Sequence, residues 1–86
     1  MNSVELLEES VDAARRIGFQ VREEWFGGSG GGACAVRGQK LLFLDLNLGP
    51  RERLQQVLDA LRADPQTAEI IMTIALRRLV ETRAAA

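Results

Sequence analysis

The side chains that perform most protein chemistry are almost missing from this chain. Its 86 residues include no histidine, no tyrosine and a single cysteine, Cys34. Without an imidazole there is no ordinary general base, proton relay or metal ligand, and one cysteine is too few for a structural zinc site. The neighbouring carboxylates of Glu23 and Glu24 would point to opposite faces of a strand. We therefore expect no enzyme: no catalytic residues, no metal and no cofactor.

Cys34 has two interpretations. It follows a glycine-rich segment whose amides would stabilise a thiolate, which suggests a nucleophilic or redox role. It also shares a strand face with Val36 and has no base nearby, so we favour a small, buried apolar side chain. A lone cysteine forms no internal disulfide, and we expect a reducing, cytoplasmic location.

A glycine-rich segment precedes this cysteine. Its residues are Gly27, Gly28, Ser29, Gly30, Gly31 and Gly32. Successive backbone amides of this kind can bind an anion or the phosphate of a nucleotide. A phosphate loop, however, is followed by a helix, and here a strand is predicted to follow. We favour a mobile hairpin loop that orders on a partner or ligand, and we keep anion or nucleotide binding as an alternative.

Two aromatic residues, Trp25 and Phe26, come just before the loop, on opposite faces of the predicted strand. We favour packing of both in the core. An exposed aromatic beside a mobile loop would instead mark a binding edge, so Trp25 joins the loop as a candidate partner site.

The hydrophobic pattern then predicts the elements that hold these residues. A helix over residues 3–17 is expected, with Asn2 and Glu5 as a variant capping box. Alternating residues predict a strand over 19–25, and two strand-like runs, over 33–36 and 40–46, are joined by a type II′ turn at Gly38-Gln39. The run Leu41-Leu42-Phe43-Leu44 puts apolar bulk on both faces, as in a strand covered on both sides.

Two further helices complete the prediction. One begins at Pro50, and the other begins at Asp64-Pro65 and continues to about Arg83. The fold class is α+β, as one domain over residues 1–86: one helix, a three-stranded antiparallel meander, then two helices.

The last helix is too apolar for one packing face. Its main stripe, which includes Ile71, would face the domain's own core, while Ile70 and Ile74 lie on the far side beside Arg77 and Glu81. We predict a homodimer with the isoleucines at the centre of the interface and the two charged residues at its rim. In the competing hypothesis, another part of the same chain covers Ile70 and Ile74.

Charge and hydropathy exclude other partners. With 11 basic and 12 acidic side chains the net charge is −1, and no basic stripe suited to nucleic acid is present. The N-terminus is acidic and lacks a hydrophobic signal region, and no apolar run approaches the roughly 20 residues of a membrane-spanning helix. We expect no nucleic acid and no membrane among the partners.

The order of segments resembles one enzyme family. The segments Arg16-Ile17-Gly18-Phe19 and Val36-Arg37-Gly38-Gln39-Lys40-Leu41-Leu42-Phe43-Leu44-Asp45 and the helix that follows are similar to the front half of the ImmA/IrrE-type zinc metallopeptidase domain. In that family the following helix carries His-Glu-x-x-His. Here it carries Val57-Leu58-Asp59-Ala60-Leu61-Arg62-Ala63, without a ligand or a base. The resemblance covers roughly residues 5–63 and implies a catalytically dead relative.

The favoured function is therefore a small non-enzymatic interaction module that self-associates through its C-terminal helix. The resemblance supplies a rival, a dead peptidase-like domain that binds a peptide along a sheet edge. The third hypothesis is anion or nucleotide binding at Gly27–Gly32.

Overall fold

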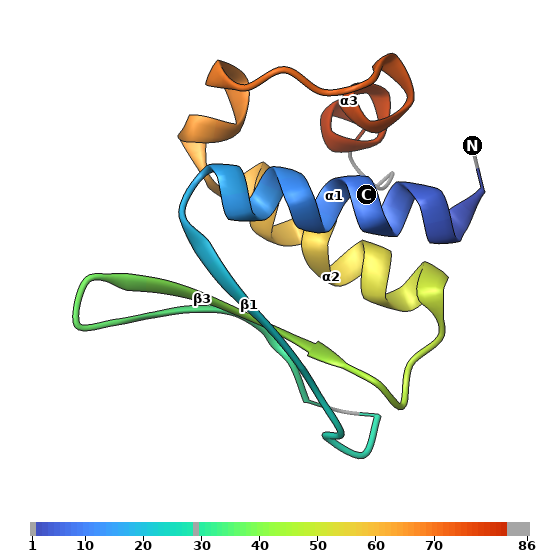
Figure 1. The fold of residues 1–86 in the computed structure, drawn as a ribbon, viewed down its shortest axis with the longest axis vertical. Helices are drawn as coiled ribbons and strands as arrows, with labels where there is room; N and C mark the ends of the chain where they lie inside the picture. The colour runs from blue at the N-terminus through green and yellow to red at the C-terminus, as the bar shows by residue number, and fades with distance from the viewer. Residues whose placement is uncertain (1, 29, 83–86) are drawn as a thin grey trace.

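The fold of the computed structural model, which describes residues 2–28 and 30–82, is a three-stranded sheet with helices on one face. Its elements are α1 (Ser3–Arg16), β1 (Phe19–Glu24), β2 (Gly32–Val36), β3 (Gln39–Asp45), α2 (Pro50–Ala63), the 3₁₀ helix η1 (Pro65–Glu69) and α3 (Ile74–Glu81). Helices α1 and α2 pack together over the sheet, and η1 and α3 lie on the far side of this helix pair (Figure 1). The predicted α+β class is confirmed.

The sheet is mixed, so the predicted antiparallel meander is wrong. Its strand order is β1-β3-β2, in which β3 pairs parallel with β1 and antiparallel with β2. Strands β1 and β2 are therefore not neighbours. The glycine-rich segment between them passes the end of β3 to reach the opposite edge of the sheet and does not close a hairpin.

The turn between β2 and β3 lies one residue earlier than predicted. Val36 pairs with Gln39, which leaves Arg37 and Gly38 as the turn residues. Their φ angles are 52° and 80°. Two positive φ angles define a type I′ turn, whose twist matches that of the flanking strands, and the predicted type II′ turn is wrong.

The predicted starts of the first two helices are confirmed. The Asn2 side chain accepts a hydrogen bond from the Glu5 N–H at 2.9 Å and donates one to the Glu5 carboxylate at 3.2 Å. At α2, Pro50 takes the first helical position, and the Glu52 carboxylate accepts the Gly49 N–H at 3.2 Å. These contacts satisfy donors that a helix N-terminus leaves without intrahelical partners.

The core lies between the sheet and the helix pair. Leu42 and Leu44 of β3 are fully buried beneath α1 and α2. On the other face of β3, Leu41 and Phe43 are only half-buried, so this strand is not covered on both sides as its apolar run suggested. Phe26 covers part of that face, with its ring edge-to-face against Phe43 at 5.9 Å between centroids.

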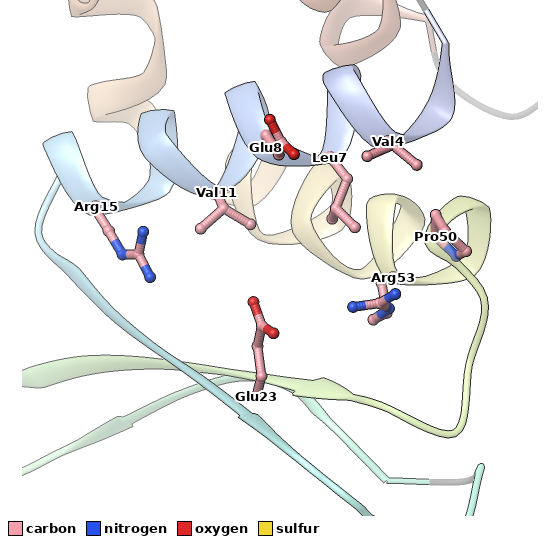
Figure 2. A pocket seen from close by; sticks show the side chains of 8 residues that line it. All are labelled: Val4, Leu7, Glu8, Val11, Arg15, Glu23, Pro50 and Arg53. Atoms are coloured by element: carbon pink, nitrogen blue, oxygen red, sulfur yellow. The ribbon is translucent and has the colours of Figure 1, made fainter.

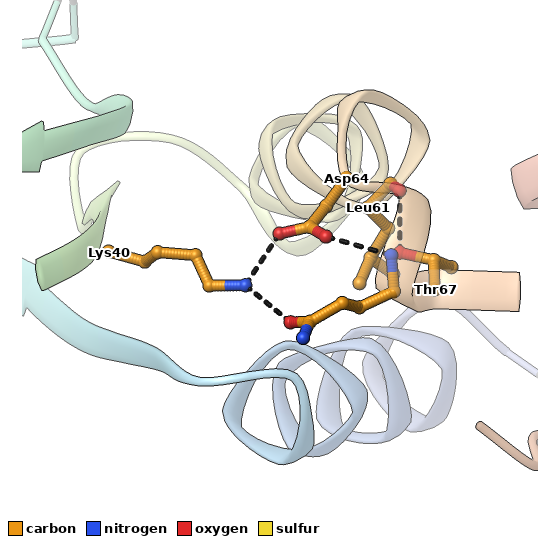
Figure 3. Close-up of polar contacts among 5 residues, drawn as sticks. Lys40, Leu61, Asp64 and Thr67 are labelled. Atoms are coloured by element: carbon orange, nitrogen blue, oxygen red, sulfur yellow. Dashed lines mark hydrogen bonds and ion pairs between the residues drawn. The ribbon is translucent and has the colours of Figure 1, made fainter. Parts of the chain in front are cut away.

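A polar cluster holds the junction between α2 and η1 (Figure 3). The Asp64 carboxylate accepts the Gln66 N–H at 2.9 Å and the Lys40 ammonium at 2.7 Å, and Lys40 also donates to the Gln66 side-chain carbonyl at 2.8 Å. The hydrogen bond from Lys40 lowers the pKa of Asp64 by more than burial raises it. The predicted cap at Asp64-Pro65 is thus present, but it begins a 3₁₀ helix.

The predicted continuous helix to Arg83 is wrong, because the chain leaves helical geometry after η1. Ile70 is extended, with φ −108° and ψ 156°. Thr73 then caps a new helix, its hydroxyl accepting the Leu76 N–H at 3.2 Å. Helix α3 ends at Glu81, and Arg83 lies outside the described residues.

Candidate functional site

The break before α3 separates the predicted interface residues. Ile70 is half-buried and packs against the core, whereas Ile74 is 73% exposed. Ile71, which a continuous helix would direct to the core, is 86% exposed. Ile71 and Ile74, which we call the isoleucine ridge, are therefore the apolar residues presented to solvent here.

A carboxylate of α1 fixes one end of the unwound segment. Glu9 accepts the Thr73 N–H at 2.7 Å and the Thr73 hydroxyl at 2.6 Å. Because charged acceptors make the stronger hydrogen bonds, this bidentate contact sets where α3 starts and how it lies on α1.

Two guanidinium groups bind carbonyls of the same segment. Arg16 donates to the Ile71 carbonyl at 2.6 Å, and Arg77 donates to the Ile70 carbonyl at 2.7 Å and the Thr67 carbonyl at 3.3 Å. Arg77, predicted as an interface rim residue, is thus half-buried and bound to its own chain. Glu81, the other predicted rim residue, is exposed at the end of α3.

One amide of the glycine-rich segment donates to a carboxylate of the chain itself. The Asp45 carboxylate accepts the backbone N–H groups of Phe26 at 3.1 Å, Gly28 at 2.7 Å and Asn47 at 2.9 Å. Burial raises the pKa of Asp45, but the hydrogen bonds from Asn47, Phe26 and Gly28 outweigh it and bring the pKa to about 2. An external phosphate would have to compete with this carboxylate for the Phe26 and Gly28 amides.

The second half of the loop packs against α2. The Gln56 side chain donates to the Gly30 carbonyl at 3.1 Å, and its own carbonyl accepts the Asp45 N–H at 3.3 Å. A Cβ on Gly30 would lie 2.5 Å from the Phe26 side chain. The loop is therefore tied to the fold at several points, and close packing requires glycine at position 30. Ser29 lies outside the described residues.

The remaining candidates lie around the sheet. Trp25 is 73% exposed and Phe26 is 36% exposed, so the predicted burial of both in the core is wrong, and Trp25 keeps its place as a candidate contact residue. Cys34 is exposed on β2, which contradicts the prediction of a buried small side chain. Its strand is at the edge of the sheet and the helices leave it uncovered.

Sequence analysis missed Ile71 because a helical projection assumes an unbroken helix. One signal was available: Thr73 is a favourable N-cap residue three positions before Leu76. The partners that stabilise the break, Glu9 and Arg16, lie on α1, and no local pattern links them to it.

The described residues offer no built metal centre. Residues 2–28 and 30–82 contain no group of three or more His, Cys, Asp or Glu side chains placed to hold a metal ion. Within the same ranges, no helix is both long enough and apolar enough to cross a membrane. The arrangement presents binding surfaces made of apolar side chains and fixed charges.

No protein-family model, curated protein or solved structure matches the chain. The resemblance to ImmA/IrrE-type metallopeptidases is neither supported nor contradicted by these comparisons.

Proposed function

We propose that this protein is a non-enzymatic interaction module that self-associates through the isoleucine ridge. The observation that carries the proposal is the exposure of Ile71 and Ile74, at 86% and 73%, on a segment that hydrogen bonds hold in place. Burial of an exposed isoleucine stabilises by about 1.5 to 3 kcal/mol. A partner that covers the ridge gains this free energy without first having to order the segment.

A second copy of the chain is the partner that the surroundings favour. In a two-fold dimer the ridge would bury its isoleucines twice. Two isoleucines alone fall short of the roughly 800 Å² that each partner of a standard interface buries, so the contact must extend over the outer face of α1. There Asp12 and Arg16 form an ion pair at 3.2 Å, and Arg16 also binds the Ile71 carbonyl. In a two-fold dimer, Asp12 of one copy can pair with Arg16 of the other, because the rim carries one charge of each sign.

The test is the oligomeric state of a double variant, Ile71→Glu with Ile74→Glu. By light scattering at high micromolar concentration we expect a dimeric parent and a monomeric variant that keeps its helical circular dichroism and cooperative melting. Val36→Glu is the matched control, because Val36 is a 49% exposed apolar residue on β2, and this control should remain dimeric. A monomeric parent, or a double variant that stays dimeric, would overturn the proposal.

We place the module in the cytoplasm, since its lone cysteine is exposed and a reducing compartment keeps it a thiol.

Peptide binding at a sheet edge is a second candidate, favoured by the character of β2. Residues 33–36 are exposed and uncharged, whereas the other edge strand, β1, carries an arginine and two glutamates. Charged side chains protect an edge from pairing with a further strand, and β2 lacks them. The two edges of this sheet therefore differ in their capacity to accept an extended segment.

The register indicates which amides would bind. Val36 and Gln39 flank a two-residue turn and so form a hydrogen-bonded pair, which directs the N–H groups of Ala33 and Ala35 to the free edge. A short peptide of alternating valine and threonine should shift the amide signals of these two residues. Ala35→Pro removes one donor at an edge position that tolerates proline and should abolish the shift, whereas the control Cys34→Ser should retain it. A peptide that shifts neither amide excludes this candidate.

A further inference from the structure

A pocket of about 360 Å³ opens between α1, β1 and the start of α2 (Figure 2). Its apolar wall is formed by Val4, Leu7 and Val11 of α1 together with Pro50 of α2. This volume is near the lower end of the 300 to 1,000 Å³ typical of small-molecule sites. The pocket therefore suits a ligand the size of an amino acid better than a nucleotide cofactor.

Charged side chains from three elements line this pocket, and they include a second carboxylate, Glu8 of α1. Figure 2 shows the guanidinium groups of Arg15 and Arg53 on either side, with the Glu23 carboxylate rising between them from β1. These side chains enter none of the ion pairs within the described residues, which join other partners. The Nε of Arg53 is buried and has no hydrogen-bond partner there. Because this nitrogen is shielded from solvent, a ligand in the pocket would bind the terminal nitrogens of the Arg53 guanidinium, which Figure 2 shows facing the pocket.

The charged and apolar side chains of this pocket together indicate the chemistry of its ligand. Guanidinium groups recognise carboxylates, with which they form paired, charge-assisted hydrogen bonds. A carboxylate such as that of Glu23 binds an ammonium group. The apolar wall of Leu7 and Val11 accommodates a hydrocarbon side chain. We infer that this pocket binds a free α-amino acid with a branched or aromatic apolar side chain, its carboxylate on Arg53 and its ammonium on Glu23.

Other small ligands satisfy fewer of these groups. A simple apolar carboxylate would meet the arginines but would face Glu23 with a like charge, which is unfavourable. An apolar amine would satisfy Glu23 and leave the Arg53 guanidinium without a carboxylate. A divalent cation would meet the carboxylates of Glu8 and Glu23, but Arg15 and Arg53 would repel it. The zwitterion alone pairs with both signs of charge, and this binding is independent of the isoleucine ridge.

The first experiment compares four ligands by amide chemical-shift titration of the folded protein. They are leucine, 4-methylpentanoate, which lacks the ammonium, 3-methylbutylamine, which lacks the carboxylate, and glycine, which lacks the side chain. Leucine should shift the signals of Leu7, Val11 and Glu23, and the other three should bind at least about tenfold more weakly, as expected when one charged or apolar contact is lost.

Two variants assign the roles of the charges. Arg53→Met keeps most of the aliphatic chain but removes the guanidinium, and should weaken leucine binding about tenfold or more. Glu23→Gln should weaken leucine binding and strengthen that of 4-methylpentanoate, an inversion that loss of folding would not produce. Arg51→Met and Glu24→Gln are matched controls, because they are exposed neighbours outside the pocket lining, and both should bind leucine as the parent does.

Several results would overturn the inference. One is the absence of shifts near the pocket with leucine and with phenylalanine. Another is 4-methylpentanoate binding as tightly as leucine to the parent protein. The third is leucine affinity unchanged in folded Arg53→Met.

Discussion

The Asp45 carboxylate, at the end of the central strand, accepts the backbone N–H of Gly28 at 2.7 Å across a sequence separation of 17 residues. The same side chain accepts the N–H of Phe26, two residues beyond the end of β1, and that of Asn47 just after β3. One carboxylate thus ties together the end of β1, the glycine-rich segment and the exit from β3. This contact explains how the chain crosses β3 without a hairpin, since the buried anion collects the amides of the crossing segment.

Acid should weaken the fold through Asp45. Its pKa is lowered from 3.8 to about 2 by the hydrogen bonds that it accepts. A folded-state pKa below the unfolded value means that this stabilisation is fully present above the unfolded pKa and is lost as the pH falls through the folded one. We expect the free energy of unfolding, from urea titrations, to fall between about pH 4 and pH 2. The pKa of Asp64 is also lowered, so the stabilisation that Asp64 contributes likewise decreases as the pH falls.

Asp45→Asn isolates this contribution. The variant should be less stable than the parent at neutral pH and should show a flatter pH dependence in the acid range, because the group that titrates has been replaced. Asp59→Asn is the control, since its side chain is 77% exposed, and it should keep the parent's pH profile. Equal stability of Asp45→Asn and parent at neutral pH would show that the carboxylate does not hold the loop.

Alanine substitutions at two loop glycines should differ in cost. Gly28 and Gly31 have similar φ angles, 88° and 98°, so alanine is strained at both. A Cβ at Gly28 meets nothing within 4 Å, whereas one at Gly31 would lie 2.5 Å from the Gln56 amide nitrogen and 2.8 Å from the Phe43 carbonyl oxygen. We expect about 1 to 2 kcal/mol lost at Gly28, the backbone term alone, and about 1 to 3 kcal/mol more at Gly31, as in overpacked sites.

Chemical denaturation of Gly28→Ala and Gly31→Ala measures both costs. Equal losses would mean that Gln56 and the Phe43 carbonyl move aside readily, and the loop would then be less tightly packed than these distances indicate.

The parts of the fold that sequence analysis predicted are those set by neighbouring residues. Asn2 and Glu5 lie one helical turn apart, and Pro50 fixes its own φ, so their roles follow from local chemistry. The apolar run of residues 41–44 likewise predicted the strand β3, although only Leu42 and Leu44 of this run are buried. In each of these cases, the residues that determine the local structure lie within a few positions of one another in the sequence.

The errors arose where distant residues decide the local structure. Near Ile71 the one local signal is Thr73, which can cap a new helix, and the Ile71 carbonyl is bound by Arg16 at a separation of 55 residues. The alternating pattern of β1 also does not indicate how β1 pairs with β3, because this pattern is compatible with a parallel or an antiparallel neighbour. The isoleucine ridge could not be identified before the break was known. The charges of the pocket are likewise ordinary surface residues until the fold brings them together.

Removal of the Glu9 carboxylate should loosen the ridge. Glu9→Ala eliminates two charged hydrogen bonds to Thr73 and should cost about 1.5 to 3 kcal/mol. The amides of Thr73, which donates to Glu9, and Leu76, which donates to the Thr73 hydroxyl, should then lose hydrogen-exchange protection relative to the core. Glu69→Ala is the control, as an exposed glutamate of η1, and should leave both properties nearly unchanged. Unaltered exchange in Glu9→Ala would mean that Arg16 and Arg77 suffice to hold the segment.

Helix α3 is closed at its C-terminal end by an arginine of α2. The Arg62 guanidinium donates to the carbonyls of Leu79 at 2.6 Å, Thr82 at 2.9 Å and Val80 at 3.1 Å. These carbonyls belong to the last turn of α3, where acceptors lack intrahelical donors and a positive charge is favourable. Arg62→Met preserves much of the side-chain volume and should lower the free energy of unfolding by about 1.5 to 3 kcal/mol, measured by urea denaturation.

Arg62→Lys tests the geometry of this cap. A lysine carries the same charge but lacks the planar fork that reaches several carbonyls, so it should recover only part of the lost stability. Arg78→Met is the matched control on α3 itself, since Arg78 is exposed, and it should change the stability by less than about 0.5 kcal/mol, as is usual for surface substitutions. Full recovery in Arg62→Lys would show that positive charge alone closes the helix. A loss in Arg78→Met as large as that in Arg62→Met would mean that α3 depends on its total charge and not on the three hydrogen bonds from α2.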